Sequence, residues 1–274
     1  MDKSLSLAEI EANLKTRWLG RAQCPNELWQ TIDSTNNRGK ELARTGLAAG
    51  AMIIAMHQSA GRGRSSNAWH SPPNSGLYLS FIIKPQLAQT DLGVVTLVAG
   101  VAVAQAIQSC LSIKVGLKWV NDLILEGKKV GGILVEYVNV SEPILVVGIG
   151  LNLHKANENM PADLESKIAF LDTFARSSAR QYAIDRNQLV ACIANELEIA
   201  LEMMQSDLQF LLNQWRAYSV TLGQEIMANV GNEKIIGQAL DITDGGALII
   251  KTHSGIVNLA AGEISLRKVD GGYA

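Results

Sequence analysis

Hydrophobic positions gather in runs of two lengths along the first half of the chain. Short apolar runs cover residues 51–57 and 77–83, and each is bounded by Gly, Ser or Pro, which is typical of strands. The most apolar stretch, 94–107, is interrupted by polar residues and is shorter than the ~20 residues that span a bilayer. We therefore expect a buried helix over 92–111 and no membrane partner.

Two further patterns in this half predict a short helix and a group of strands. Thr35 is a suitable N-cap and Gly46 a suitable C-terminal stop for a helix over 36–45. Between residues 114 and 152 short strand-like runs follow one another, and Glu126-Gly127-Lys128 has the composition of a hairpin turn. We expect these strands to belong to one connected sheet.

The second half of the chain changes from a helical to a strand-like pattern near residue 220. Residues 163–218 have a helical pattern, with Asp185 as the N-cap of an amphipathic run. Beyond Leu222, β-like runs separated by glycine turns cover 224–230, 233–242, 246–251 and 255–260. Runs at this spacing predict a small antiparallel barrel. The chain is thus expected to be α+β, with domains at 1–220 and 221–274.

Composition excludes several classes of protein. A hydrophobic share of 47% and a charged share of 18% exclude a wholly disordered chain. The net charge of -2 lacks the basic excess of a protein that grips phosphates, so no nucleic-acid partner is expected. Charged residues interrupt positions 1–20, which removes the apolar core of a signal peptide and predicts a cytoplasmic protein. Cys24, Cys110 and Cys192 lack the spacing of a disulfide framework or a zinc site.

The loop after the first strand carries the clearest sign of ligand chemistry. Residues 58–64 read QSAGRGR, which places two guanidinium groups on a backbone freed by glycines. Such a loop can surround an anion with side-chain and amide donors. A solvated surface loop is the alternative interpretation. A phosphate-binding P-loop is excluded, because the chain has no GxxxxGK(S/T) motif.

Two later segments add polar groups at strand ends. Residues 118–123 read KWVNDL and join a cation, an aromatic ring, an amide and a carboxylate, which is also the composition of a turn with an Asx cap. Residues 128–133 read KKVGGI. The two glycines let the backbone approach a ligand closely, or they form a bulge in a solvated hairpin. Neither segment alone decides between its two interpretations.

The order of these motifs resembles one family of enzymes. Together with DSTN at 33–36 and GIGLN at 148–152, they are similar over about residues 15–270 to the biotin protein ligases. The resemblance implies a mixed-sheet catalytic domain with packed helices and a small C-terminal SH3-like β-barrel. It also implies that ATP and Mg²⁺ are used to convert biotin to biotinyl-5'-AMP. Biotin would then pass to a lysine of the biotin carboxyl carrier protein of acetyl-CoA carboxylase. A monomer and a homodimer are both compatible with the resemblance.

The resemblance assigns a role to each residue of these motifs. It implies that the catalytic residues are Lys129, Arg64, Arg62 and Lys118, with Lys129 between the biotin carboxylate and the α-phosphate. It places biotin against Ser34, Thr35, Asn36 and Gln58, and the ligand-ordered loop at Arg62, Gly63 and Arg64. It places the nucleotide against Trp69, Lys118, Asn121, Asp122 and Asn152. Asp122 would hold the metal, and the backbone at Gly131 and Gly132 would approach the ligands.

The chain departs from the family pattern in two places. The family's loop usually continues as GRGRxGRxW, whereas here Ser65, Ser66, Asn67 and Ala68 precede the tryptophan, which removes a glycine and an arginine. We expect the loop to guard the adenylate less tightly as a result. Val120 replaces a proline, and we expect a small effect because valine readily adopts extended backbone.

Two other functions remain open at this point. A lipoate-type ligase of the same fold would perform the same adenylation on another acid, although the GRGR loop argues against it. A non-catalytic biotin-binding or nucleic-acid-binding module is the alternative that the altered loop motivates. A DNA-binding repressor is not expected, because only about 30 residues precede the DSTN motif; we expect the monofunctional type.

Overall fold

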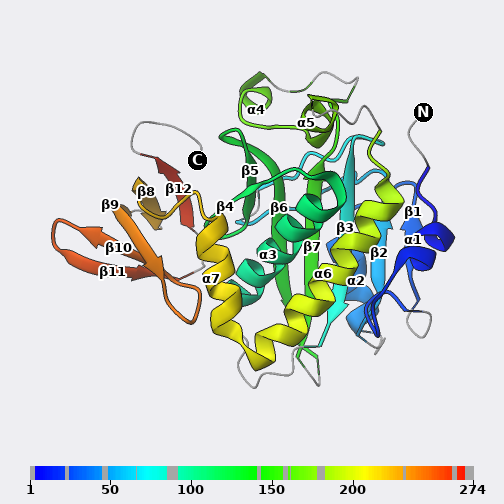
Figure 1. Cartoon of the computed structure of the whole chain (residues 1–274), viewed down its shortest axis with the longest axis horizontal. Helices are drawn as coiled ribbons and strands as arrows, with labels where there is room; N and C mark the ends of the chain where they lie inside the picture. The colour runs from blue at the N-terminus through cyan, green and yellow to red at the C-terminus, as the bar shows by residue number, and fades with distance from the viewer. Residues whose placement is uncertain are drawn as a thin grey trace.

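Seven strands form the larger of two sheets in the computed structural model, which describes residues 4–21, 25–44, 49–65, 67–84, 92–140, 143–156, 160, 162–177, 183–230, 233–260 and 264–268. The strand order is β1-β2-β3-β7-β6-β5-β4 (Figure 1). The strands are β1 (Glu27–Trp29), β2 (Met52–Ala55), β3 (Gly76–Ile83), β4 (Gly116–Lys118), β5 (Asp122–Leu125), β6 (Lys128–Val138) and β7 (Ile144–Asn152). Among these described strands β1 and β2 pair in parallel and the other neighbours pair antiparallel, so the sheet is mixed.

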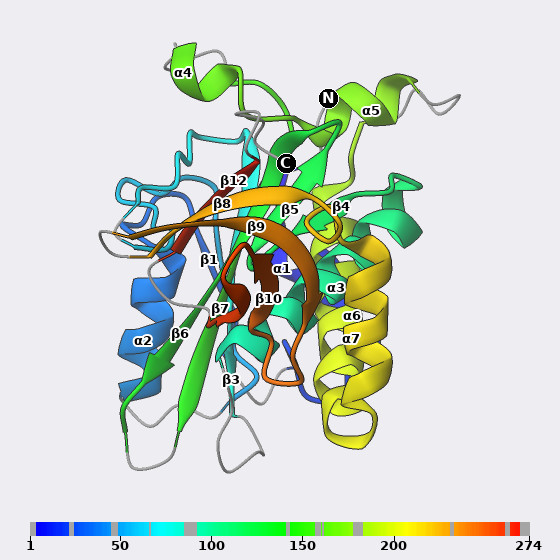
Figure 2. The same ribbon diagram turned by 90° about the vertical axis from the view of Figure 1, so that its left-hand side faces the viewer.

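Helices cover both faces of this sheet. On one face lies α2 (Thr35–Arg44), and on the other lie α3 (Leu92–Leu111), α6 (Arg186–Ser206) and α7 (Leu208–Tyr218) (Figure 2). The core accordingly has two parts. A small cluster that includes Ile53, Ile82 and Val146 packs against α2, and a large cluster that includes Phe81 and Val147 packs against the other helices. Because both faces are covered, β3 is buried at every position.

The two helices predicted in the first half of the chain are confirmed. The helix expected over 92–111 is α3, and although it is long and apolar enough to cross a membrane, it lies mostly buried in the core. The helix expected over 36–45 is α2. The predicted N-cap was wrong, because Thr35 is the first helical residue. Its hydroxyl instead donates to Gln58 Oε1 at 3.2 Å.

The predicted hairpin between β5 and β6 is also confirmed. Glu126 and Gly127 both adopt left-handed backbone, with φ of 49° and 73°. Two consecutive residues of this kind make the tight turn that matches the twist of paired strands. The turn, together with an irregularity in the pairing between Leu123 and Ile124, sets a register in which Asp122 lies opposite Gly132. It thereby brings the KWVNDL and KKVGGI segments side by side.

Over its described residues, 163–177 and 183–218, the predicted helical region corresponds to four helices. They are α4 (Ala162–Glu165), α5 (Leu171–Ser177), α6 and α7. Asp185 is the N-cap of α6, as predicted, and its carboxylate accepts from the backbone N–H groups of Asn187 at 3.0 Å and Gln188 at 3.1 Å. The sequence did not predict α1 (Leu7–Asn13), which packs against α6.

The second sheet is antiparallel and has the order β11-β10-β9-β8-β12. Its strands are β8 (Glu225–Val230), β9 (Glu233–Ile242), β10 (Leu248–Thr252), β11 (Gly255–Leu259) and β12 (Ile264–Lys268). The first four were predicted, and β12 was not. Over the described residues the sheet is strongly curved, with β11 and β12 at its edges, rather than a ring closed by hydrogen bonds (Figure 2).

Trp119 connects the two sheets. Its backbone N–H donates to Thr221 Oγ1 at 2.9 Å, and its indole N–H donates to the Gly246 carbonyl at 3.0 Å. The peptide bond between Trp119 and Val120 is cis. From α7, Arg216 Nε donates to Asp241 Oδ1 at 2.7 Å. The second sheet is therefore fixed beside the KWVNDL segment.

Candidate active site

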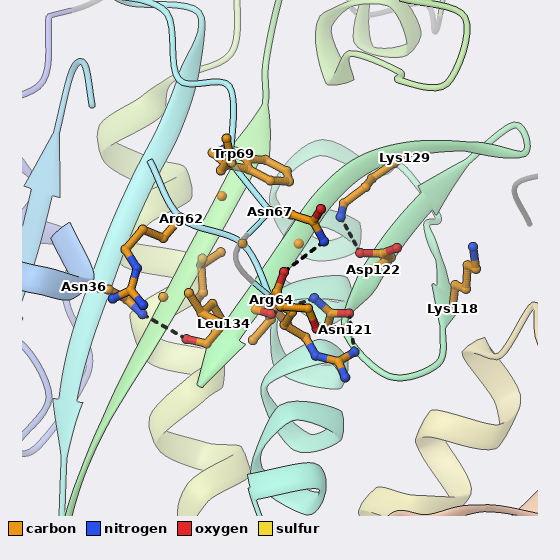
Figure 3. Close-up of a pocket in the computed structure, with 18 of the residues that line it drawn as sticks. Asn36, Arg62, Arg64, Asn67, Trp69, Lys118, Asn121, Asp122, Lys129 and Leu134 are labelled. Carbon is orange, nitrogen blue, oxygen red and sulfur yellow. Dashed lines mark hydrogen bonds and ion pairs between the residues drawn. The ribbon is translucent and has the colours of Figure 1, made fainter. Parts of the chain in front are cut away.

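A cavity of 440 Å³ lies between the loop of residues 58–69, strands β6 and β7, and the second sheet (Figure 3). The first turn of α2 and the KWVNDL segment complete its wall. From the second sheet, Asn229, Leu266 and Arg267 reach it. Segments as far apart in sequence as Ser34 and Arg267 thus share one concave site, the kind of place where small ligands bind.

The structure brings most of the predicted site residues to this cavity. Those that line it are Ser34, Thr35, Asn36, Gln58, Arg62, Gly63, Arg64, Trp69, Lys118, Asn121, Asp122, Lys129 and Gly132. Gly131 and Asn152 lie outside the lining. Gly131 faces the opposite side of the sheet, where an added Cβ would lie 2.6 Å from the Leu151 side chain. Asn152 Nδ2 donates to the Lys129 carbonyl at 3.4 Å.

The part of the cavity expected to hold biotin is a buried, uncharged hydrogen-bond network. Gln58 Oε1 accepts from the Thr35 backbone N–H at 2.9 Å, and Gln58 Nε2 donates to Ser71 Oγ at 2.9 Å. The Ser80 hydroxyl donates to Asn36 Oδ1 at 2.6 Å and lies 2.8 Å from the Thr35 hydroxyl. Fixed polar groups of this kind suit a neutral polar ligand group, because they are oriented before it arrives.

Trp69 lies across two glycines of the sheet. A Cβ at Gly150 would lie 2.6 Å from the indole Cε2, and one at Gly132 would lie 3.2 Å from Cζ3. At Gly150 any side chain would therefore displace the ring. Lys129 Nζ lies 5.2 Å from the ring centroid, within cation–π range. The indole face is thus placed beside the cation on which the chemistry is expected to depend.

Lys129 forms an ion pair with Asp122. Its Nζ lies 2.5 Å from Asp122 Oδ1, and both side chains are largely buried (Figure 3). The pair joins β6 to β5 at the register set by the hairpin. A ligand carboxylate or phosphate that enters the cavity would compete with Asp122 for this cation.

Arg64 extends the positive charge of the site. Burial lowers the pKa of its guanidinium, and the charge of Asp122 partly offsets this. An arginine nevertheless stays protonated in a protein. Its Nη1 donates to Asn121 Oδ1 at 3.1 Å, and Asn121 Nδ2 in turn donates to the Ile133 carbonyl at 2.9 Å. The loop that carries Arg64 is therefore tied to the sheet through Asn121.

The side chains of the cavity can be compared with the ligands that the expected magnesium ion needs. Within the described part of the chain, no group of three or more His, Cys, Asp or Glu residues could hold a metal. Asp122 is the carboxylate among the described residues that line the cavity, and it is paired with Lys129. One carboxylate is a poor site for a bare ion, but it fits Mg²⁺ that is already bound to nucleotide phosphates.

Several polar residues at or beside the cavity were missing from the sequence-based set. Ser80 is the one aliphatic hydroxyl in β3, whose other hydroxyl is the phenol of Tyr78, and a serine within such an apolar run was a usable signal. Glu136 is a charged residue within β6, and it pairs with Arg62. Arg267 belongs to β12, the strand that the pattern of turns did not indicate. Its position at the cavity depends on how the two sheets pack.

The mixed sheet carries a cavity in which an uncharged hydrogen-bond network lies near several cations. These features fit an enzyme that brings a small neutral polar molecule together with an anionic one. Consistent with this, residues 28–153 match the Biotin/lipoate A/B protein ligase family, and residues 221–267 match the Biotin protein ligase C terminal domain. A biotin--[acetyl-CoA-carboxylase] ligase of Mycobacterium tuberculosis is 30% identical over 86% of this chain and 89% of its own length. The chain belongs to the biotin protein ligase family.

Two further relatives agree with this assignment. The bifunctional ligase/repressor BirA of Bacillus subtilis is 30% identical over 96% of this chain and 79% of its own length. The solved biotin protein ligase from Aquifex aeolicus in complex with biotin and ATP superposes with a TM-score of 0.76 and is 28% identical. That match covers 89% of this chain and 99% of the Aquifex chain. Both the catalytic sheet and the second sheet are therefore shared with known ligases.

Proposed function

We propose that this ligase activates biotin with ATP and transfers it to one lysine of the biotin carboxyl carrier protein of acetyl-CoA carboxylase. The observation that carries the proposal is the position of Lys129, a cation that lines the same cavity as the neutral network of Thr35 and Gln58 and lies 5.2 Å from the ring of Trp69. A cation at this point lies where the biotin carboxylate and the α-phosphate of ATP would meet.

In the first half-reaction a biotin carboxylate oxygen attacks the α-phosphorus. The new C(O)–O–P bond forms, and the bond to the β-phosphate breaks and releases pyrophosphate. Two anions must approach each other, so fixed cations lower the barrier. Lys129, Arg62, Arg64 and Lys118 all line the cavity and would supply this field. Asp122 would hold a magnesium ion that accompanies the nucleotide, and this ion would neutralise phosphate charge.

In the second half-reaction the amine of a carrier lysine attacks the carbonyl of biotinyl-5'-AMP. An amide forms, AMP leaves and the amine loses a proton. Water must be kept from the anhydride until the carrier docks. The loop of residues 58–69 and the second sheet border the cavity, and they are the segments that would exclude water.

The direct test mixes the protein, biotin, ATP and Mg²⁺ with a biotin carrier domain. We expect the mass of one biotinyl group on one carrier lysine. Carriers with that lysine changed to arginine, and reactions without ATP, serve as controls. Lipoate in place of biotin should support little ATP–pyrophosphate exchange. Exchange that is faster with lipoate than with biotin would contradict the proposed substrate.

A further inference from the structure

Glu136 is a carboxylate that lies beside the cavity without lining it. It belongs to β6, and 18% of its side chain is exposed. Three donors from two other segments converge on it: Asn36 Nδ2 at 2.9 Å, Lys40 Nζ at 3.0 Å and Arg62 Nη1 at 3.0 Å. A half-buried carboxylate with this many donors is a fixed junction rather than a solvated surface charge.

The surroundings of Glu136 keep it ionised. Burial alone would raise the pKa of this carboxyl, but hydrogen bonds from Asn36 and Lys40 and the charges of Lys40 and Arg62 outweigh burial and lower it. Asn36 and Lys40 are four residues apart on α2, so both side chains lie on the helix face toward β6. Glu136 therefore joins α2, β6 and the loop of residues 58–69, the arginine loop, through one negative charge.

Glu136 determines how Arg62 presents its donors. Within the described residues, the contacts of Arg62 to Glu136 and to Asn37 Oδ1, at 2.9 Å, all use Nη1. Its Nε and Nη2 groups are thus left for a ligand. Both N–H bonds of Nη1 lie in the guanidinium plane, so two separate acceptors, Asn37 and Glu136, fix that plane and with it the directions of Nε and Nη2.

Glu136 also orients Asn36. The Asn36 amide donates to Glu136 and, at 3.2 Å, to the Leu134 carbonyl, which leaves Oδ1 directed at Ser80. Gly148 provides the necessary room, since a Cβ there would lie 2.1 Å from Asn36 Oδ1. Two cavity-lining side chains, Asn36 and Arg62, thus depend on the same carboxylate.

We propose that Glu136 is a positioning residue for the biotin side of the site, which holds Arg62 and Asn36 in their binding orientation before the ligand arrives. It acts through these two residues and does not touch the substrate. The inference rests on the proposed function, because it assumes that the neutral network beside Arg62 receives biotin.

The test is Glu136→Gln, which keeps the side-chain volume but removes the charge. The matched control is Glu41→Gln on the exposed side of α2, where Glu41 pairs with Arg38 at 3.1 Å. We expect the KM for biotin to rise about tenfold in Glu136→Gln, as for loss of one charge-assisted hydrogen bond. The KM for ATP should change less than about twofold, and the control should match the wild type.

A double-mutant cycle with Arg62→Gln separates positioning from general structural damage. If Glu136 acts through Arg62, its substitution should raise the KM for biotin less than about threefold in the Arg62→Gln background. Effects as large as in the wild type in both the Arg62→Gln and the Asn36→Ala backgrounds, or an unchanged KM in Glu136→Gln, would overturn the proposal.

Glu136→Asp provides a second variant if Glu136→Gln does not fold. It keeps the charge between Lys40 and Arg62, but the shorter side chain cannot keep every contact. The same rise in KM and the same loss of effect in the Arg62→Gln background are expected. A wild-type protein that makes no biotinyl-5'-AMP would refute the proposed function. An active wild type with no effect of Glu136 would refute only this inference.

Discussion

At the scale of single residues, the site is organised around Lys129 and the groups that hold it. Asp122 pairs with its ammonium at 2.5 Å, and the ring of Trp69 lies 5.2 Å away. The sequence motifs indicated all three residues but not their mutual contacts. A hairpin register and a glycine-lined strip of sheet create those contacts, and neither can be read from residue identity alone.

Lys129→Gln should lower the rate of biotinyl-5'-AMP formation by about 10²-fold or more, because one fixed cation is lost where two anions meet. ATP–pyrophosphate exchange measures the rate, and thermal melting checks that the variant is folded. Lys128→Gln is the matched control, since Lys128 is the adjacent exposed lysine of β6. Near-normal adenylation by folded Lys129→Gln would refute the role of Lys129.

Trp69→Ala should raise the KM for ATP about tenfold, and that for biotin much less, because stacking on an aromatic ring serves the nucleotide base. Gly150→Ala should act in the same direction, since its Cβ would displace the indole. Gly100→Ala is the control, because its nearest contact would be an ordinary 3.5 Å. The KM for each substrate is measured by titrating ATP and biotin separately. A rise in the KM for biotin alone would mean that Trp69 contacts biotin rather than the nucleotide.

At the scale of elements, the arginine loop is held by hydrogen bonds between its own residues. Ser66 lies outside the described residues, but Asn67 bonds the loop internally. Its carbonyl accepts from the Gly63 N–H at 2.7 Å, and its Nδ2 donates to the Arg64 carbonyl at 2.9 Å. The expectation that this loop guards the adenylate less tightly than its relatives stays a prediction.

Asn67→Ala should increase the release of free biotinyl-5'-AMP about fivefold in the absence of carrier, because it removes one hydrogen bond that holds the loop turn. The released adenylate is quantified by chromatography. The total rate of ATP consumption with carrier present should change little. Unchanged release would mean that the Asn67 side chain does not hold the loop closed.

Tyr78 of strand β3 makes the free energy of unfolding depend on pH in the alkaline range. Burial raises the pKa of Tyr78 to about 12, although a hydrogen bond with Ser75 and the charge of Arg186 oppose the rise. The folded state therefore binds this proton more tightly than the unfolded chain does. Its contribution is fully present below the unfolded pKa of about 10 and is lost as pH rises through the folded pKa.

The wild type should consequently lose on the order of 2 kcal/mol of unfolding free energy between about pH 10 and pH 12 through Tyr78. Urea unfolding at a series of pH values measures this loss. Tyr78→Phe is the comparison, and its curve should be flatter over the same range. Parallel curves for the two proteins would contradict the assignment of the loss to Tyr78.

Most helices and strands could be predicted from local sequence patterns. For those that could not, the reason can be identified. The helices α2 and α3, the N-cap at Asp185 and the turn at Glu126 depend on neighbours within a few residues. The short strand β1 carries little pattern of its own. The helix α1 does carry a local signal, since Ser6 caps it and accepts from the backbone N–H of Glu9 at 3.4 Å, and this signal was missed. The backbone N–H groups of Arg17, Trp18 and Leu19, which follow α1, bond the buried carboxylate of Glu198 at 2.6–2.9 Å, a contact across about 180 residues.

At the scale of the whole molecule, the second sheet completes the cavity. Trp119 and Arg216 fix it to the catalytic sheet, and the turn at Gly246 lies against the start of α3. Arg267 thereby reaches the cavity from β12. The structure thus adds a cation of the second sheet to the cavity, and the anionic nucleotide is the ligand expected to use it.

Arg267→Ala should therefore impair the use of ATP more than the binding of biotin. We expect a rise of about tenfold in the KM for ATP, as for the loss of one charge-assisted contact to a phosphate. Lys234→Ala, on the exposed part of β9, is the control. Biotin binding is measured by calorimetry without ATP, and a large loss there would contradict the division of roles between the sheets.

The sequence by itself determined the alternation of helices and strands, the change to a β domain after residue 220 and the motif residues that carry the chemistry. These features depend on periodicity, caps and turns, which act between residues close in the chain. Only the tertiary structure decided that Gly131 faces away from the cavity, that Asp122 holds Lys129 and that Glu136 joins α2 to the arginine loop. Such contacts depend on strand register and on packing between distant segments, where a shift of one residue moves a side chain to the other face of the sheet.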